Sequence, residues 1–279
     1  MELNKIYCGD AVAVMQKILP NDCIDLIVTS PPYDKIRLYN GYIFDYKSVI
    51  RECFRVVKPG GRVVWIVGDQ CSDFNESSTS FQQALYFKET GFRLNDTMIW
   101  NKMGQRTYNP TLRACKHYFD YMFVFSKGKP LVYNEIKDVV SHWAGKKLET
   151  YSTRHTDGVI VKRKREGTYG EFQARSNIWG IRPPINTTGH PAVFPESLAR
   201  DHILMWSNSN DTVLDPLAGS GTTLKAAKNL GRNYIGIELS QEYCDIAEAR
   251  VAGRLGIFQD EKLMEENGDV WDDIFGGGT

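Results

Sequence analysis

The segment from Asp211 to Ser240, DTVLDPLAGSGTTLKAAKNLGRNYIGIELS, constrains the fold more than any other part of the chain. It begins with a short apolar strand at 212–215, continues through a glycine-rich turn into a helix-forming stretch, and ends in a second apolar strand at Glu238. A strand, a helix and a second strand in this order form a βαβ unit, whose two strands lie parallel in one sheet. The segment therefore predicts an α/β fold.

The glycine-rich turn of this unit has the features of an adenosine-binding site. Gly219 and Gly221 allow close backbone approach, and Glu238 follows about twenty residues later, where a carboxylate can bind ribose hydroxyls. Leu224 stands in place of the third glycine of the dinucleotide pattern, and the chain has no G-x-x-x-x-G-K-[ST] segment. These departures disfavour NAD and ATP and favour S-adenosylmethionine, an adenosine cofactor without a pyrophosphate. An ordinary tight turn between strand and helix is the alternative.

A second apolar run, at 24–29, ends abruptly in Ser30-Pro31-Pro32-Tyr33. Each proline fixes φ and lacks a backbone N–H, so the loop is stiff and presents carbonyl oxygens with few competing donors. Such a loop suits a ligand group that only donates hydrogen bonds. A rigid turn at the end of a strand is the alternative.

The remaining apolar runs indicate a circularly permuted order of elements. We expect strands at 5–8, 24–29, 62–68, 94–101 and 119–126, helices at 10–18, 46–57, 79–90 and 241–252, a helix within 190–208 with Pro195 in its first turn, and a turn at 58–61. No strand follows the helix 241–252, although an adenosine-binding half usually continues with one. The strand 5–8 is available for that place. Asp10, at its end, either accepts from the adenine amine or caps the next helix.

Composition and charge exclude several other classes of protein. No apolar run is long enough to cross a bilayer and the N-terminus lacks a signal-peptide pattern, so we expect a cytoplasmic protein. The six cysteines have no zinc-binding spacing, and we expect no metal site. The net charge is zero, but residues 145–182 lean basic, and VKRKR at 161–165 is either a phosphate-binding run or a solvated loop.

Seven motifs in their order along the chain resemble those of the β-class DNA amino-methyltransferases. They are GDA (9–11), TSPPY (29–33), RVVKPGGRVVWIVGD (55–69), FDYMFVFSK (119–127), HPAVFPESL (190–198), DPLAGSGTT (215–223) and YIGIELS (234–240). The resemblance implies a Rossmann-like methyltransferase sheet in permuted order, with S-adenosylmethionine as cofactor and double-stranded DNA as partner. It divides the chain into a catalytic half (1–128), an inserted target-recognition module (129–188), a cofactor-binding half (189–258) and an acidic tail, expected to be disordered (259–279).

The resemblance also implies the residues of the site. The cofactor-binding residues are expected to be Asp10, Thr29, Phe194, Asp215, Pro216, Ala218, Gly219, Ser220, Gly221, Thr222, Thr223, Glu238 and Leu239. The catalytic residues are expected to be Ser30, Pro31, Pro32 and Tyr33, and the DNA-binding residues Lys162, Arg163, Lys164 and Arg165. For Phe194, ordinary core packing is the alternative to packing on the cofactor.

The chemistry of the Ser-Pro-Pro-Tyr loop fits methylation of a base amine. Such an amine is a weak nucleophile because its lone pair is delocalised into the ring. Ser30 Oγ and the Pro31 carbonyl oxygen can each accept one amine hydrogen, which localises the lone pair, and Tyr33 can stack on a base flipped out of the duplex. Serine at the first position favours N4 of cytosine over N6 of adenine.

Two other functions stay open from the sequence. Methylation of a protein glutamine uses a similar Pro-Pro-Tyr motif, but an unpermuted order and asparagine at the first position are expected there. A catalytically silent DNA-binding subunit is the second alternative. It has no need of catalytic and cofactor-binding residues, so the presence of Ser30, Tyr33, Asp215 and Glu238 argues against it. Phe119-Asp120 departs from the His-Glu of many relatives. A homodimer and a cognate restriction endonuclease are further partners that the family allows.

Overall fold

The computed structural model describes residues 1–32, 44–72, 74–103, 118–148, 151–154, 156–163, 167–183 and 194–254. Three of the expected site residues, Tyr33, Lys164 and Arg165, lie outside these ranges, as does the expected tail at 259–279. The helices are α1 Ala11–Ile18, α2 Tyr46–Val56, α3 Thr79–Thr90, α4 Glu196–Trp206, α5 Thr222–Asn229 and α6 Gln241–Val251. None of the helices in the described ranges is long and apolar enough to cross a membrane.

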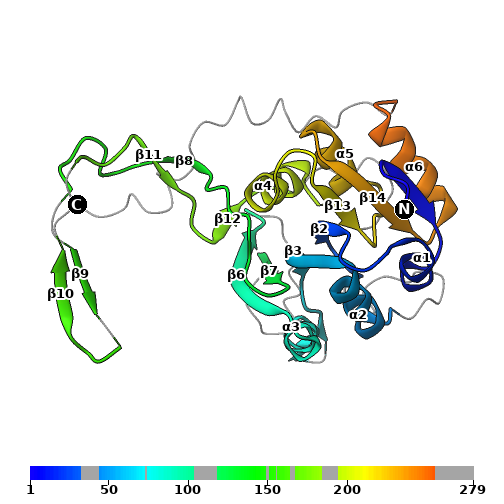
Figure 1. Cartoon of the computed structure of the whole chain (residues 1–279), viewed down its shortest axis with the longest axis horizontal. Helices are drawn as coiled ribbons and strands as arrows, with labels where there is room; N and C mark the ends of the chain where they lie inside the picture. The colour runs from blue at the N-terminus through cyan, green and yellow to red at the C-terminus, as the bar shows by residue number, and fades with distance from the viewer. Residues whose placement is uncertain are drawn as a thin grey trace.

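Eight strands form one mixed sheet in the main body of the molecule, which lies to the right in Figure 1. Their order is β1-β14-β13-β2-β3-β7-β6-β12, with β1 Lys5–Cys8, β14 Asn233–Glu238, β13 Thr212–Asp215, β2 Ile24–Thr29, β3 Val57–Val67, β7 Phe119–Ser126, β6 Arg93–Asn101 and β12 Ile178–Gly180. Neighbours pair in parallel except at β7, which is antiparallel to both β3 and β6. The expected α/β fold is therefore confirmed.

The first strand of the chain completes the C-terminal part of the sheet. β1 pairs in parallel with β14, and Cys8 stands opposite Glu238. The Gly9 amide extends this pairing by donating to the Glu238 carbonyl oxygen at 2.8 Å. The place beside β14 is thus taken by a strand from the N-terminus, as expected, and the permuted order is present in the topology.

Helices cover both faces of the sheet (Figure 1). One face packs against α1, α2 and α3, where Met15, Ile50 and Phe87 are fully buried. Phe87 of α3 stacks on Phe125 of β7 with ring centroids 4.2 Å apart. The other face packs against α4 and α5 through residues such as Ile203. This apolar sandwich fixes the strands, so the loops at their carboxyl ends start from rigid positions.

Residues 58–61 differ from the expected turn between a helix and a strand. They belong to β3, but they interrupt its pairing with β2, because Ile24 stands opposite Val57 and Leu26 opposite Arg62. Gly60 has φ +85°, which suits glycine. The Lys-Pro-Gly-Gly segment therefore does turn locally, but as a bulge inside a strand. Pro195, expected within the first turn of α4, is its N-cap residue instead.

The chain between β7 and α4 forms small ladders that extend away from the large sheet (Figure 1). β8 Lys137–Val140 pairs with β11 Phe172–Ala174, and β9 Tyr151–Arg154 pairs with β10 Ile160–Arg163. Two short strands, β4 Cys71–Ser72 and β5 Asn75–Glu76, pair elsewhere, after β3. Arg175, just after β11, forms ion pairs with Asp138 of β8 and with the buried Asp201 of α4. This arginine ties the base of the extension to the body of the protein.

Candidate active site

The candidate site lies where the two central parallel strands end. From β13 the chain passes through α5 to β14 on one side, and from β2 it passes through α2 to β3 on the other side. Open α/β sheets bind ligands at such a switch point, outside the carboxyl ends of the strands. The glycine-rich turn follows β13 and the Ser30-Pro31-Pro32 segment follows β2. The two motifs that the sequence singled out therefore begin on neighbouring strands.

Tight packing shapes the glycine-rich turn. Gly219 and Gly221 have φ of +50° and +79°, a region that favours glycine. A Cβ on Gly221 would lie 2.9 Å from Ala247 Cβ of α6, so only glycine lets this helix approach. Leu224, at the position of the absent third glycine, packs on Gly236, where a Cβ would lie 2.3 Å from Leu224 Cδ1. The close contact between α5 and β14 therefore depends on a glycine of the strand, Gly236, and not on a third glycine in the helix.

Glu238 brings a carboxylate to the mouth of this turn. It ends β14 and is half-buried. Its Oε2 accepts from the Gly219 amide and its Oε1 from the Ser240 amide, both at 2.9 Å. Each carboxylate oxygen keeps a further lone pair for another donor. Glu238 therefore both orders the turn and can accept from a bound hydroxyl.

Asp215 ends β13 and connects the two motifs. Its side chain is 1% exposed, and its Oδ1 accepts from Thr29 Oγ1 at 2.7 Å and from the Leu217 amide at 3.1 Å. Burial raises the pKa of Asp215 to about 6, although hydrogen bonds from Thr29 and Thr223 oppose the rise. Thr29 is fully buried, so its hydroxyl serves this carboxylate. The end of β2 is thereby held against the start of the glycine-rich turn.

The other expected cofactor residues lie around this point in different ways. Asp10 follows β1 and accepts from the Ala13 amide at 3.0 Å, which is the helix cap considered above. Phe194 is half-buried and packs against the apolar cluster under α4, and Leu239 is 48% exposed beside Glu238. Pro216, Ala218, Gly219, Gly221 and Thr223 are all buried within the turn.

The Ser-Pro-Pro segment is described only up to Pro32. Ser30 and Pro32 are half-buried and Pro31 is buried, directly after the last residue of β2. Tyr33 lies outside the described residues. The structure thus places the expected amine acceptors beside Thr29, one residue from the contact with Asp215.

Sequence reasoning missed the role of Arg250. This residue of α6 is 3% exposed, and its Nη1 donates to Ser220 Oγ at 3.0 Å and to Thr222 Oγ1 at 2.8 Å. The hydroxyls of Ser220 and Thr222 therefore face the interior, and a ligand at the turn would meet the backbone of these two residues. A single arginine in the helical sequence QEYCDIAEARV carries no signal of this contact.

The expected DNA-binding residues lie in the extension. Lys162 and Arg163 are exposed on β10. Nearby in the sequence, Trp143 is 52% exposed with Lys146 Nζ 4.4 Å from its ring centroid, and Tyr169 lies at a centroid distance of 6.3 Å from Trp143.

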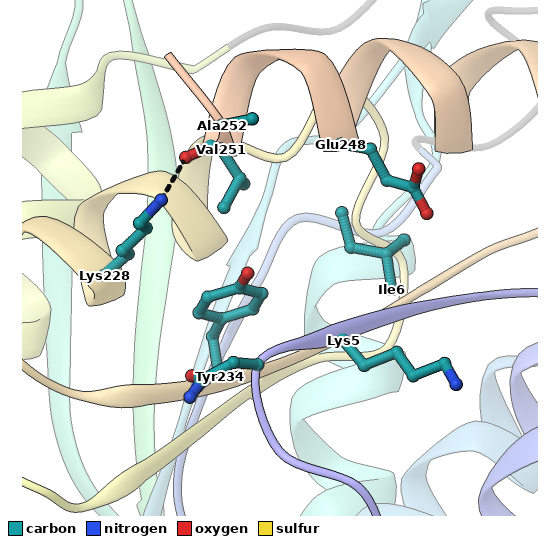
Figure 2. Close-up of a pocket in the computed structure, with 8 residues that line it drawn as sticks. Lys5, Ile6, Lys228, Tyr234, Glu248, Val251 and Ala252 are labelled. Atoms are coloured by element: carbon teal, nitrogen blue, oxygen red, sulfur yellow. Dashed lines mark hydrogen bonds between the residues drawn. The ribbon is translucent and has the colours of Figure 1, made fainter.

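A surface cavity of about 220 Å³ lies elsewhere, at the amino ends of β1 and β14 (Figure 2). It is lined by Asn4, Lys5, Ile6, Lys228, Tyr234, Glu248, Val251 and Ala252. Lys228 Nζ donates to the Val251 carbonyl oxygen at 2.8 Å and so satisfies the end of α6 (Figure 2). The cavity is at the opposite end of the strands from Glu238. Within the described ranges, no cluster of His, Cys, Asp or Glu could hold a metal ion.

Comparison with known proteins identifies the class to which this site belongs. Residues 24–249 match the model of the N6_N4_Mtase family, described as DNA methylase. The chain is a member of this family. It is 48% identical to the orphan methyltransferase M.BamHII of Bacillus amyloliquefaciens over 256 residues, covering 88% of this chain and 95% of the relative. It is 29% identical to the type II methyltransferase M.BglII of Bacillus subtilis, covering 90% of this chain and 69% of the relative.

Solved structures support the fold. TTHA0409 of Thermus thermophilus, in complex with S-adenosyl-L-methionine, superposes with a TM-score of 0.60 at 28% identity, covering 91% of this chain and 96% of that one. The cytosine-N4-specific PvuII DNA methyltransferase superposes with a TM-score of 0.63 at 19% identity, covering 94% and 90%. The second likeness concerns the fold alone. The family match over residues 24–249 and the 48% identical relative confirm the expected DNA amino-methyltransferase family.

Proposed function

We propose that the protein is a site-specific, S-adenosylmethionine-dependent DNA methyltransferase that modifies the N4 amine of cytosine in duplex DNA. The observation that carries the proposal is the hydrogen bond between Thr29 and Asp215 at the switch point, which joins the ends of β2 and β13. Thr29, the residue before Ser30, donates to Asp215 at the start of the glycine-rich turn. Ser30 and Pro31, whose oxygens are the proposed amine acceptors, therefore follow directly after a residue that contacts the start of the proposed cofactor turn.

The described residues at the turn fit an adenosine cofactor with a cationic sulfonium group. Gly219 and Gly221 leave room for close backbone approach, and Glu238 offers free lone pairs to ribose hydroxyls. Asp215 and Glu238 also supply negative charge beside the site. We assign the remaining expected cofactor residues, from Asp10 to Leu239, to the walls of the same pocket.

The chain's residues perform the chemistry by positioning the target amine. S-adenosylmethionine, when bound, supplies an electrophilic methyl group. Ser30 Oγ and the Pro31 carbonyl oxygen each accept one amine hydrogen, so that the nitrogen lone pair turns towards the methyl carbon. As the new nitrogen–carbon bond forms, the methyl–sulfur bond would break and the sulfonium would leave as a neutral thioether. The methylated nitrogen would then be cationic and would lose its proton to water without a dedicated base. Pro32 keeps the loop rigid, and Tyr33 stacks on the flipped base.

DNA recognition is assigned to the insertion at 129–188, between the catalytic half at 1–128 and the cofactor-binding half at 189–258. Its extension presents Lys162 and Arg163 for phosphate contact, with Lys164 and Arg165 continuing the basic run. Trp143 and Lys146 add an exposed aromatic ring under a cation, an arrangement suited to a nucleic-acid surface. Arg175 holds the base of this extension on α4, which supports a fixed geometry between recognition and catalysis.

A homodimer and a cognate restriction endonuclease are finer proposals about partners. The relatives include an orphan enzyme and type II enzymes, so both a solitary and a paired role have precedents among them. Sedimentation equilibrium of the purified chain tests the dimer, and cleavage assays with the products of neighbouring genes test the endonuclease.

Nucleoside mass spectrometry of plasmid from a methylation-deficient host that expresses the chain tests the proposed function. N4-methylcytosine is expected from the natural sequence and is expected to be lost with Ser30→Ala. N6-methyladenine alone would overturn the choice of base and leave a DNA amino-methyltransferase. Unmodified DNA together with methylated protein glutamine would support the alternative protein substrate.

A further inference from the structure

A buried arginine lies behind the glycine-rich turn. Arg250 of α6 donates through one nitrogen to Ser220 Oγ and Thr222 Oγ1, at 3.0 and 2.8 Å. These hydroxyls belong to the residues on either side of Gly221, which has a left-handed conformation and whose lack of a Cβ leaves room for Ala247 of α6. One guanidinium group therefore holds both flanks of the most constrained glycine in the turn.

The same guanidinium group also faces the start of α4. Its Nη2 lies 4.0 Å from Glu196 Oε2, and the same carboxylate oxygen accepts from Lys225 Nζ at 2.8 Å. Glu196 Oε1 accepts from Asn229 Nδ2 at 3.2 Å. Taking a cation out of water is unfavourable, and an apolar side chain of similar length would avoid this penalty. The two hydroxyl groups and the Glu196 carboxylate are polar partners that favour an arginine at this position.

We propose that Arg250 is a positioning residue for the cofactor. It fixes the peptide groups of Ser220 and Thr222 in the conformation that the cofactor meets, and through Glu196 it joins the turn to the start of α4, two residues after Phe194. The side chain itself is buried, so it acts through the two hydroxyl groups and not by direct contact with the cofactor. The inference rests on the proposed function, because it takes residues 219–223 as the cofactor site.

Pre-organisation gives this contact its effect on affinity. A turn with two left-handed glycines has many conformations when it is not held, and a ligand that binds one of them must supply the ordering free energy. The two hydrogen bonds from Arg250 supply that ordering before the cofactor arrives. Arg250→Met removes both donors and the charge, whereas Arg250→Lys keeps the charge with a different donor geometry.

Calorimetric titration of the full chain with S-adenosylmethionine tests the inference. Arg250→Met is expected to weaken binding about tenfold or more, and Arg250→Lys is expected to lie in between. The matched control is Arg254→Met, because Arg254 is exposed just past the end of α6. In steady-state assays, KM for the cofactor is expected to rise while KM for DNA stays unchanged. Urea unfolding of each variant measures stability separately.

A combined variant keeps the test decisive if Arg250→Met folds poorly. Ser220→Ala with Thr222→Val removes the two acceptors, is expected to weaken cofactor binding by a similar factor, and is expected to make a further Arg250→Lys change nearly neutral. Lower stability with an unchanged cofactor affinity in the folded variants would overturn the inference and show a structural role. If the natural chain does not bind S-adenosylmethionine at all, the result overturns the proposed function itself, and the inference about Arg250 falls with it.

Discussion

Replacing Thr29 by valine tests the buried contact between the two central strands. Thr29 Oγ1 donates to Asp215 Oδ1 at 2.7 Å, and neither side chain is more than 1% exposed. Valine has nearly the same shape without the donor, so the change removes one hydrogen bond and leaves little cavity. Loss of a bond to a buried carboxylate costs about 1.5–3 kcal/mol, whereas loss of a bond between neutral groups costs about 1 kcal/mol.

The pKa of Asp215 makes the effect of this change depend on pH. Burial raises the pKa to about 6 from an ordinary value of 3.8. Because the folded protein then holds the proton more tightly than the unfolded chain, the contribution of Asp215 lowers the free energy of unfolding as the pH rises from about 4 to about 6. The Thr29 hydrogen bond holds the pKa of Asp215 down, so without this donor the folded-state pKa rises further and the fall continues to a higher pH.

Urea unfolding at about pH 5 and about pH 8 measures this difference. Thr29→Val is expected to destabilise the protein by about 1 kcal/mol at the lower pH and by about 2–3 kcal/mol at the higher pH. Thr29→Ser keeps the hydroxyl group, so we expect it to destabilise the protein less, and by the same amount at both pH values. Other titrating groups contribute equally to both proteins and cancel. A Thr29→Val effect that does not change with pH would refute the reasoning.

Three further predictions concern the cofactor, acid stability and DNA. Glu238→Gln removes the charge that accepts two backbone amides, so calorimetry is expected to show about ten- to hundredfold weaker S-adenosylmethionine binding, with the exposed Glu242→Gln unchanged as control. Burial lowers the pKa of His202 to about 3 from 6.5, so its contribution to stability is lost as the pH falls below about 6.5, and His202→Gln is expected to flatten the acid limb of urea unfolding. Lys162→Gln with Arg163→Gln is expected to weaken the salt dependence of DNA binding. In gel-shift titrations the negative slope of log affinity against log salt is expected to become smaller in magnitude by about 2, and an unchanged slope would exclude phosphate contact.

Much of the fold follows from local patterns in the sequence. The strands at 24–29 and 119–126 are apolar runs that end before Pro31-Pro32 and Gly128 respectively, and their observed bounds agree with expectation. The place of β1 beside β14 could be predicted because an adenosine-binding half usually has one more strand than the sequence offers after 234–238, and the strand at 5–8 was available for it. The bulge at 58–61 could not be distinguished from a turn, since its difference lies in the pairing of Val57 with the neighbouring strand.

The extension between β7 and α4 shows where sequence patterns fail. β8 is exposed at each of its positions, and β10 at most of its positions, so neither strand has an alternation of apolar and polar residues. The contact of Arg250 with Ser220 and Thr222 also has no local signal, because it depends on the approach of α6 to Gly221. In both cases the missing information is tertiary: which surface a residue meets is decided by elements distant in the sequence.

The junction at Thr29 and Asp215 explains how a permuted chain can keep one site. The two residues are far apart in the sequence, but β2 and β13 are adjacent and parallel, so both motifs leave the sheet at the same edge. The hydrogen bond between them requires only this adjacency and not the order in which the chain visits the strands. The same reasoning applies at β1, whose Gly9 amide bonds to the carbonyl group of Glu238 from the other end of the chain. Moving the chain ends therefore changes the connections outside the sheet, whereas the neighbours of the glycine-rich turn are set by the strand order alone.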